Sequence, residues 1–182
     1  KGRPRPGPGG IERRVMKSMR RRHQMELIQS LRRFFQNEGF LEALTPPLVQ
    51  NPGMETHIHA FQAYSAHKKE LLPLYLHTSP EFCLKELLSD HAKEKLEKVY
   101  SLAYCFRDEP ESPIHRPQFL MLEWYRLNER YEKIMDDVES LINFCVKDCP
   151  VPLRSSLKGA AMKRLTRQDI WRETIGVDPF LS

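Results

Sequence analysis

The residues between Cys105 and Tyr125 combine a permanent cation, carboxylates and an aromatic ring within one short stretch. The planar guanidinium of Arg107 can hold phosphoryl oxygens through two parallel hydrogen bonds. Glu109 lies two residues further on and points the same way in an extended chain, so it can accept a hydrogen bond from an exocyclic amine. Phe119 offers a face for stacking. The pattern suits a phosphate-bearing ligand, but such runs of charge are usually solvated residues at a hairpin tip, and composition alone does not overturn that interpretation.

Two apolar runs must position this stretch. Val99–Phe106 and Phe119–Tyr125 have the aromatic and apolar composition of buried strands, and the second run carries a single carboxylate at Glu123. If the two runs pair antiparallel, the polar residues between them form the tip of a long hairpin. His115 or Arg116, on the return arm of that tip, can then reach a terminal phosphate.

A second group of polar residues lies at the start of a helix. Leu74–His77 predicts a short strand that runs directly into Thr78, Ser79, Pro80 and Glu81. Thr78 or Ser79 can cap the helix. Pro80 suits the first turn, and the carboxylate of Glu81 favours the positive end of the helix dipole. Helix chemistry alone explains this segment, and a binding role for Glu81 is the second interpretation.

Further helices flank these segments. Ile11–Glu38 has an apolar stripe and strongly basic opposite faces, and Gly39 suits its C-terminal cap. Tyr131–Asp148 is amphipathic, and Thr166–Ile175 begins at an N-cap threonine. The basic helix face could bind nucleic acid or be solvated. Lys1–Gly10, rich in proline, glycine and basic residues, predicts a disordered linker.

Composition and spacing exclude several other classes. The chain has 182 residues, 40% of them hydrophobic, and a net charge of +5, which permits a polyanionic partner without requiring one. Four cysteines without a signal-like segment indicate a reducing cytosol, and no apolar run is long enough to cross a membrane. Asn51–Lys69 predicts a loop. Its His57 and His59 lack a nearby cysteine or acid at ligand spacing, so no protein metal site is predicted.

These segments together resemble the class II aminoacyl-tRNA synthetases. Phe106–Glu109, His115–Phe119 and Met121–Tyr125 resemble motif 2 of that class, placed at about residues 104–125. The helix, Gly39 and the Thr-Pro pair at 45–46 resemble motif 1, at about residues 31–48. Within the class the chain is most similar to the lysyl branch, and there to the stand-alone paralogues that modify a lysine of elongation factor P.

The resemblance implies an α+β fold with an antiparallel sheet flanked by helices, and activation of lysine or a lysine isomer with ATP. Mg²⁺ would bridge the phosphates, with motif 1 forming a homodimer in the cytoplasm. The acceptor would be elongation factor P or a tRNA. The implied catalytic residue is Arg107. The implied ATP-binding set adds Asp108, Glu109, His115, Arg116 and Phe119, and the implied amino-acid set is Ser79, Pro80, Glu81, Glu123 and Tyr125.

Three other interpretations stay open. Nothing in the chain resembles motif 3, so residues 11–182 are expected to be the N-terminal portion of a longer catalytic domain. That domain could belong to a true lysyl-tRNA synthetase. The lysyl branch usually has other residues at Asp108, Arg116 and Gln118, which favours a catalytically inactive paralogue that acts as a binding module. A plain RNA-binding domain that uses the basic helix is the third alternative.

Overall fold

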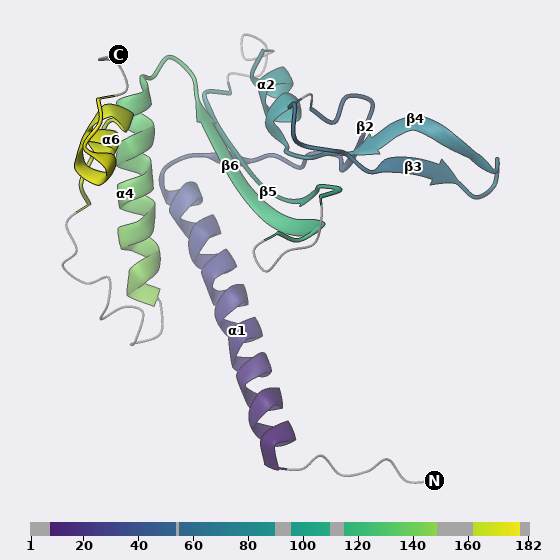
Figure 1. Ribbon diagram of the computed structural model, residues 1–182, viewed down its shortest axis with the longest axis horizontal. Coiled ribbons are helices and arrows are strands. Elements are labelled where there is room, and N and C mark those ends of the chain that lie inside the picture. Colours follow the sequence, from purple (N-terminus) through teal and green to yellow (C-terminus); the bar gives the residue numbers. More distant parts are fainter. Residues whose placement is uncertain (1–7, 54, 90–95, 110–114, 149–161, 179–182) are drawn as a thin grey trace. The chain divides into compact units, whose positions relative to one another are not determined.

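The computed structural model describes residues 8–53, 55–89, 96–109, 115–148 and 162–178. By contacts, the chain forms two compact units. One unit comprises Leu31–Asp136 and carries both sheets. The other comprises the residues up to Ser30 and those from Asp137 onward. The mixture of helices and small sheets confirms the α+β prediction (Figure 1).

The central sheet has the strand order β1-β5-β6. β5 (Lys98–Phe106) and β6 (Gln118–Arg126) pair antiparallel over their full length, from Lys98 opposite Arg126 to Phe106 opposite Gln118 (Figure 1). The predicted hairpin is therefore confirmed, with each strand within one residue of its expected bounds. The short β1 (Leu41–Glu42) pairs with β5 in parallel, so the sheet is mixed.

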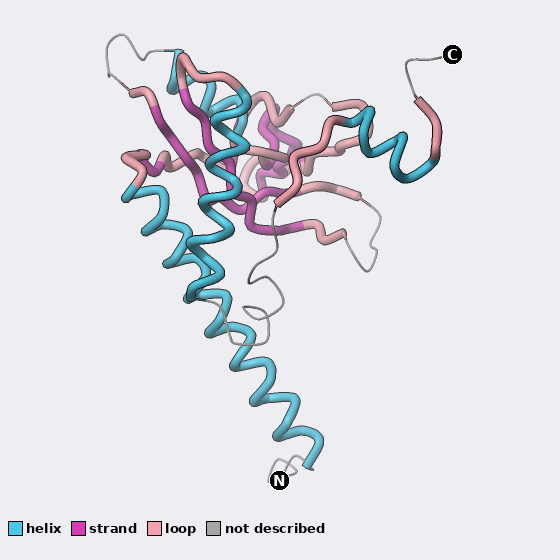
Figure 2. Tube along the Cα trace, turned by 90° about the vertical axis from the view of Figure 1, so that its left-hand side faces the viewer, coloured by secondary structure: helices cyan, strands magenta, loops and turns pink. Residues whose placement is uncertain are grey.

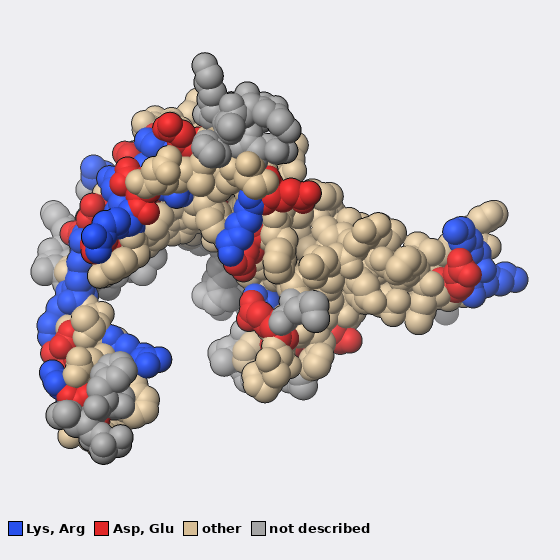
Figure 3. All heavy atoms as spheres, turned by 90° about the horizontal axis from the view of Figure 1, so that it is seen from above, with Lys and Arg blue, Asp and Glu red and all other residues tan. Residues whose placement is uncertain are grey.

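The second sheet has the order β2-β4-β3 and is antiparallel throughout (strands magenta in Figure 2). Its strands are β2 (Leu48–Val49), β3 (Gln62–Ser65) and β4 (Glu70–Leu76). Lys68 and Lys69 lie in the β3–β4 turn and Glu70 begins β4, and charges of both signs gather at the right-hand end in Figure 3.

The second sheet corrects two sequence predictions. Residues 51–69 are not loop throughout, because β3 lies within them, and β4 begins at Glu70 instead of Leu74. The strand was predicted too short because Pro73 cannot donate a backbone hydrogen bond to a neighbouring strand, which argues against a strand at that position. The ladder shifts register between Gln62 and Tyr64, and the Gln62 side-chain amide donates to the Leu72 carbonyl oxygen at 2.9 Å.

Helix α1 (Pro8–Asn37) ends one residue before the predicted Glu38 and begins earlier than the predicted Ile11. Pro8 to Gly10 are helical, contrary to the expected linker, because proline is tolerated in a first helical turn. The rest of that linker lies outside the described residues. At the other end Gly39 takes a positive φ of 76°, and the Phe40 N–H donates to the Phe35 carbonyl oxygen at 2.9 Å.

The aromatic end of α1 packs on one face of the central sheet. Phe35 is fully buried, and its ring stacks on Tyr100 with centroids 4.5 Å apart and lies 5.5 Å from Trp124. Beside this core Glu42 of β1 accepts from Arg32 and from the Tyr100 hydroxyl, each at 2.9 Å. The strands therefore have one face closed by α1, and the other face is left to form a site.

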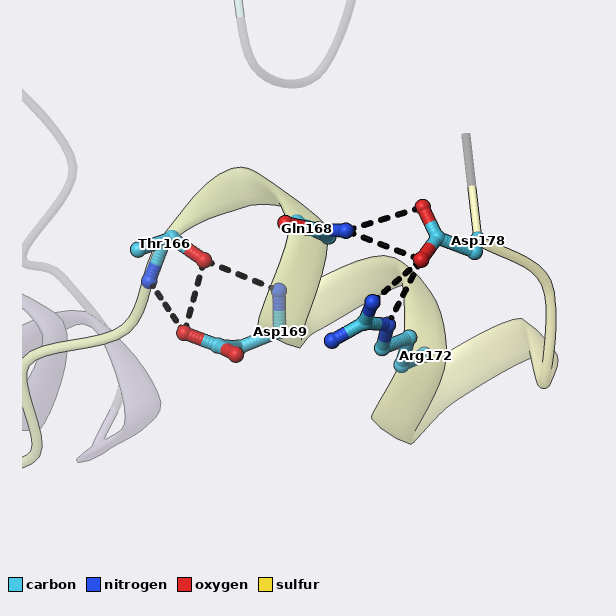
Figure 4. A network of polar contacts seen from close by, with 5 residues as sticks. All are labelled: Thr166, Gln168, Asp169, Arg172 and Asp178. Carbon is cyan, nitrogen blue, oxygen red and sulfur yellow. Dashed lines mark hydrogen bonds and ion pairs between the residues drawn. The ribbon is translucent and has the colours of Figure 1, made fainter. Parts of the chain in front are cut away.

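The later helices match their predicted bounds closely: α4 spans Tyr131–Asp148 and α6 spans Arg167–Ile175. Thr166 caps α6 in a capping box with Asp169, and Arg172 and Gln168 hold Asp178 (Figure 4). Within the part of the chain that the structure describes, no helix has the length and hydropathy to span a bilayer.

Candidate amino-acid and nucleotide site

The pairing of β5 with β6 decides which side chains share a face. Residues directly opposite in an antiparallel pair point to the same side, and the side alternates along each strand. Cys105 lies opposite Phe119, and Val99 lies opposite Tyr125. The Arg107 N–H donates to the Pro117 carbonyl oxygen at 3.0 Å, which extends the ladder by one step. Arg107, Phe119, Glu123 and Tyr125 therefore occupy the face away from the Phe35 core.

The segment before helix α2 (Glu81–Ser89) is fixed over this face. The Phe106 N–H donates to the His77 carbonyl oxygen at 3.1 Å, and the Thr78 hydroxyl donates to the Pro52 carbonyl oxygen at 2.6 Å. The Ser79 hydroxyl accepts from the Glu81 N–H at 3.0 Å, as a helix start requires.

Apolar packing anchors α2 itself. Leu84 and Leu88 of α2 are buried with Val99 of β5, and Tyr125 packs against this cluster. Because Val99 and Tyr125 lie on the same face as Arg107, α2 is held on the side of the sheet that bears the candidate site. The helix start predicted from the sequence is confirmed by these contacts.

Direct contacts join the predicted residues. The Ser79 hydroxyl donates to Oε1 of Glu123 at 2.9 Å, and the Tyr125 hydroxyl donates to Oε2 of the same carboxylate at 3.4 Å. Arg107 donates from Nε to the Thr78 carbonyl oxygen at 3.4 Å. The structure thus brings both ends of the predicted site, the loop arginine and the helix start, onto one surface.

The Glu123 carboxylate is affected by burial and by its charged neighbours. Burial raises the pKa of Glu123, and the nearby charge of Glu81 raises it further. Hydrogen bonds from Ser79 and Tyr125 and the charge of Arg107 act in the opposite direction. Burial, followed by the charge of Glu123, likewise raises the pKa of the Cys105 thiol to about 11. Burial is therefore the main cause of both raised pKa values, and the site is partly shielded from water.

The geometry of Arg107 and Phe119 fits a nucleotide. The Arg107 guanidinium carbon lies over the Phe119 ring, 5.2 Å from its centre, so a planar cation covers one face of an aromatic ring. Such a pair can meet a phosphate and a base of one ligand. Among the described residues there is no group of three or more histidines, cysteines and acids placed to hold a metal ion.

The loop between the strands is only partly placed. Asp108 and Glu109 lie on its outgoing arm and His115 and Arg116 on its return arm, while residues 110–114 lie outside the described part. The Asp108 N–H donates to the His59 carbonyl oxygen at 2.8 Å, so the segment around residue 59 lies against this arm. The nucleotide roles of these four residues stay predictions.

One polar residue of the site was missed by sequence reasoning. The Lys85 ammonium lies 2.5 Å from Oε1 of Glu81. The signal was present, because an acid followed four residues later by a lysine on a helix predicts such a pair. It was passed over in favour of the apolar stripe on the same helix.

Comparison with known proteins shows the family of the chain. Residues 11–179 match the family model of class II tRNA synthetases (D, K and N). The chain is 31% identical over 160 residues to the elongation factor P–(R)-β-lysine ligase of Vibrio vulnificus, which covers 87% of this chain and 45% of that protein. It is 34% identical over 141 residues to the ligase of the same name from Yersinia enterocolitica, covering 76% of this chain and 42% of that protein.

A third relative gives the same picture. The protein of that name from Proteus mirabilis is 33% identical over 142 residues, covering 77% of this chain and 42% of its own length. The chain thus spans less than half the length of these curated relatives. Because the family model matches nearly the whole chain, from the basic helix through motif 2 to the last helix, the protein belongs to the class II tRNA synthetases of the D, K and N group.

Proposed function

We propose that the protein activates lysine or a lysine isomer with ATP, forming an aminoacyl-adenylate, and transfers the aminoacyl group to a lysine of elongation factor P. The observation that carries this proposal is the contact between Ser79 and Glu123 at 2.9 Å, which joins the helix start to the strand bearing the second acid. Two carboxylates, Glu81 and Glu123, then face one site, and a substrate with two amino groups can occupy both.

The proposed chemistry asks mainly for positioning and charge neutralisation. A carboxylate oxygen of the amino acid bonds to the α-phosphorus of ATP as the bond to pyrophosphate breaks, so no side chain must form a covalent bond. Arg107, half-buried at the end of β5, would neutralise charge on the α-phosphate. Phe119 would stack on the base, and Glu109 would accept from its amino group. Mg²⁺, when bound, would shield the outer phosphates.

Recognition of the amino acid follows from the two acids. Glu81 would hold the amino group nearest the substrate carboxylate. Glu123 and Tyr125 would receive the amine at the far end of the side chain. The raised pKa of Glu123 is consistent with this role, because a half-buried carboxylate gains most from a matching cation.

Amino-acid-dependent exchange of pyrophosphate into ATP tests the proposal. The full-length protein should exchange with lysine or (R)-β-lysine, and Arg107→Ala should lower the rate by at least about 100-fold, as loss of a charge-stabilising donor does in other enzymes. Arg130→Ala is the matched control, because Arg130 is exposed and pairs only peripherally with Glu132 at 3.4 Å. Exchange undiminished in Arg107→Ala would refute the assignment.

The acceptor is the less direct part of the proposal. Support comes from the relatives, whose names specify elongation factor P and (R)-β-lysine. Because that acceptor is a translation factor, the reaction would take place in the cytoplasm. Transfer of labelled amino acid to purified elongation factor P, with lysine tRNA in a parallel reaction, separates this function from that of a true lysyl-tRNA synthetase. Label on tRNA alone would favour the synthetase.

An inactive paralogue differs in a measurable way. Calorimetric titration with ATP reports whether the nucleotide binds, and exchange reports whether it reacts. Binding of ATP without exchange by any lysine isomer would favour a binding module, to which the changes at Asp108, Arg116 and Gln118 would then be attributed.

The proposed assembly is a homodimer through motif 1. β1 is the outer strand of its sheet, and its flank is apolar: Leu41 is 58% exposed and Leu44 is 94% exposed. A cavity of about 340 Å³ adjoins this edge, lined by Leu44 and Thr45 among others. A second copy related by a two-fold axis would cover these leucines and the free strand edge.

A further inference from the structure

Lys85 forms an ion pair with Glu81, the acid that the substrate would need. The Nζ atom of Lys85 lies 2.5 Å from Oε1 of Glu81, one turn further along α2. Glu81 is the carboxylate that the proposed function assigns to the amino group nearest the substrate carboxylate. Lys85 therefore presents to Glu81 the same chemical group, a primary ammonium, that a substrate would present.

The rest of the site explains why a cation is needed there. Both oxygens of Glu123 accept from hydroxyl groups, of Ser79 and Tyr125. These hydrogen bonds stabilise the Glu123 carboxylate, but neither hydroxyl carries a charge that could balance the second acid, Glu81. Arg107 lies on the Glu123 side, where its charge lowers the pKa of that acid. Lys85 supplies the matching positive charge on the Glu81 side.

The surroundings of Lys85 allow its ammonium to move away from Glu81. Its side chain is 57% exposed, and exposed pairs four residues apart on a helix are weak. Lys85 also lines a groove of about 690 Å³ between α2 and residues 46–51. A released ammonium would thus enter an open, hydrated space without crossing packed side chains.

We propose that Lys85 is a stand-in for the substrate: its ammonium neutralises Glu81 while the amino-acid site is empty and is displaced into the groove when the substrate amino group binds. The inference rests on the proposed function. It makes Lys85 a positioning residue whose effect depends on one amino group of the ligand, because only that group competes for Oε1 of Glu81.

A ligand comparison isolates this effect. Lysine and (R)-β-lysine differ from 6-aminohexanoate only by the amino group near the carboxylate, so 6-aminohexanoate lacks the competing cation. Calorimetry on the full-length protein should show lysine-isomer binding tightened about two- to five-fold in Lys85→Met, the range expected from losing an exposed ion pair. Binding of 6-aminohexanoate should stay unchanged. Lys85→Arg, which keeps the cation, should bind the lysine isomers and 6-aminohexanoate with the same relative affinities as the wild type.

Lys68→Met is the matched control. Lys68 is an exposed lysine, 63% accessible, with Glu70 at 3.9 Å, and it lies on the β3–β4 hairpin. Its loss should change neither affinity. A change in Lys68→Met equal to that in Lys85→Met would show that general charge, and not displacement, governs binding.

Nuclear magnetic resonance of the lysine ammonium groups supplies a readout independent of activity. The Lys85 ammonium signal should show the paired state in the free protein, change to a solvated state with lysine, and remain paired with 6-aminohexanoate. A signal that stays paired with lysine bound, or equal affinities in Lys85→Met and wild type, would overturn the inference and leave the proposed function intact. A folded wild-type protein that binds no lysine isomer would overturn both.

Discussion

At the scale of single residues, Glu123 is the side chain on which the site depends. Burial disfavours its charge and Glu81 repels it, while the hydroxyl donors of Ser79 and Tyr125 and the charge of Arg107 partly restore it. The balance leaves the pKa of Glu123 raised, which means that its charged form is destabilised in the free protein. A substrate ammonium bound beside it would stabilise that charged form. An acid arranged in this way favours ligands that bring their own positive charge.

Ser79→Ala tests that balance. The Ser79 hydroxyl bond lowers the pKa of Glu123, so its loss should raise that pKa further. Affinity for lysine falls as the pH drops through this pKa, because the protonated acid no longer attracts an ammonium, and in the variant the fall should begin at higher pH. Carbon-13 titration of the Glu123 carboxyl and calorimetry across the same pH range measure both effects.

The raised pKa of Glu123 should also affect the pH dependence of the free energy of unfolding. An acid whose pKa is higher in the folded than in the unfolded state binds more protons when folded, so the free energy of unfolding decreases as the pH rises between the two values. That window should widen toward higher pH in Ser79→Ala. Ser89→Ala, at the exposed end of α2, is the control. A pKa of Glu123 that is unchanged in Ser79→Ala would contradict the assignment of this hydrogen bond.

At the scale of elements, the site depends on packing from the opposite side of the sheet. Trp124 lies between Glu123 and Tyr125 in β6 but faces Phe35, so both of these site residues are next to a member of the aromatic core. The end of α1 thus fixes the strand that the helix start of α2 contacts. A change in the core should reach the site through β6.

Phe35→Ala measures that dependence. Phe35 is fully buried and its ring contacts Phe34, Phe40, Tyr100 and Trp124. Truncation should lower the free energy of unfolding by about 3–5 kcal/mol, because it removes these contacts and leaves a cavity. Urea unfolding of the full-length protein measures the loss. Phe82→Ala, at a ring that is 48% exposed, should cost far less, and equal losses would place the core elsewhere.

The same elements show what the sequence could and could not predict. The sequence predicted the two strands at Val99–Phe106 and Phe119–Tyr125, because short apolar runs that are bounded by turn signals are typical of buried strands. β3 was missed because Gln62–Ser65 has only four residues and depends on β4 for its pairing. The parallel partner of β5 could not be found either, since the pairing of Leu41 with Val99 joins residues far apart in the chain.

At the scale of the whole molecule, the residues that share the site all come from the unit Leu31–Asp136. The helix start, both strands and the loop arginine were predicted one by one, and antiparallel pairing brought them together as expected. The link between Glu81 and Lys85 was visible only as spacing until the structure joined the two atoms. Residue types were enough to predict the strands and the helix start, while the pairwise contacts that decide charge balance required coordinates.

Assembly is the property that extends beyond this unit. Leu44, 94% exposed beside the free edge of β1, should be covered if a second copy docks there. Leu44→Asp should therefore convert a dimer of the full-length protein to a monomer, because a carboxylate buried at a two-fold interface meets its own copy. Analytical ultracentrifugation at several concentrations measures the change, with Leu71→Asp, 61% exposed on the β3–β4 hairpin, as control. A wild-type monomer, or a Leu44→Asp dimer of undiminished affinity, would place no interface at this edge.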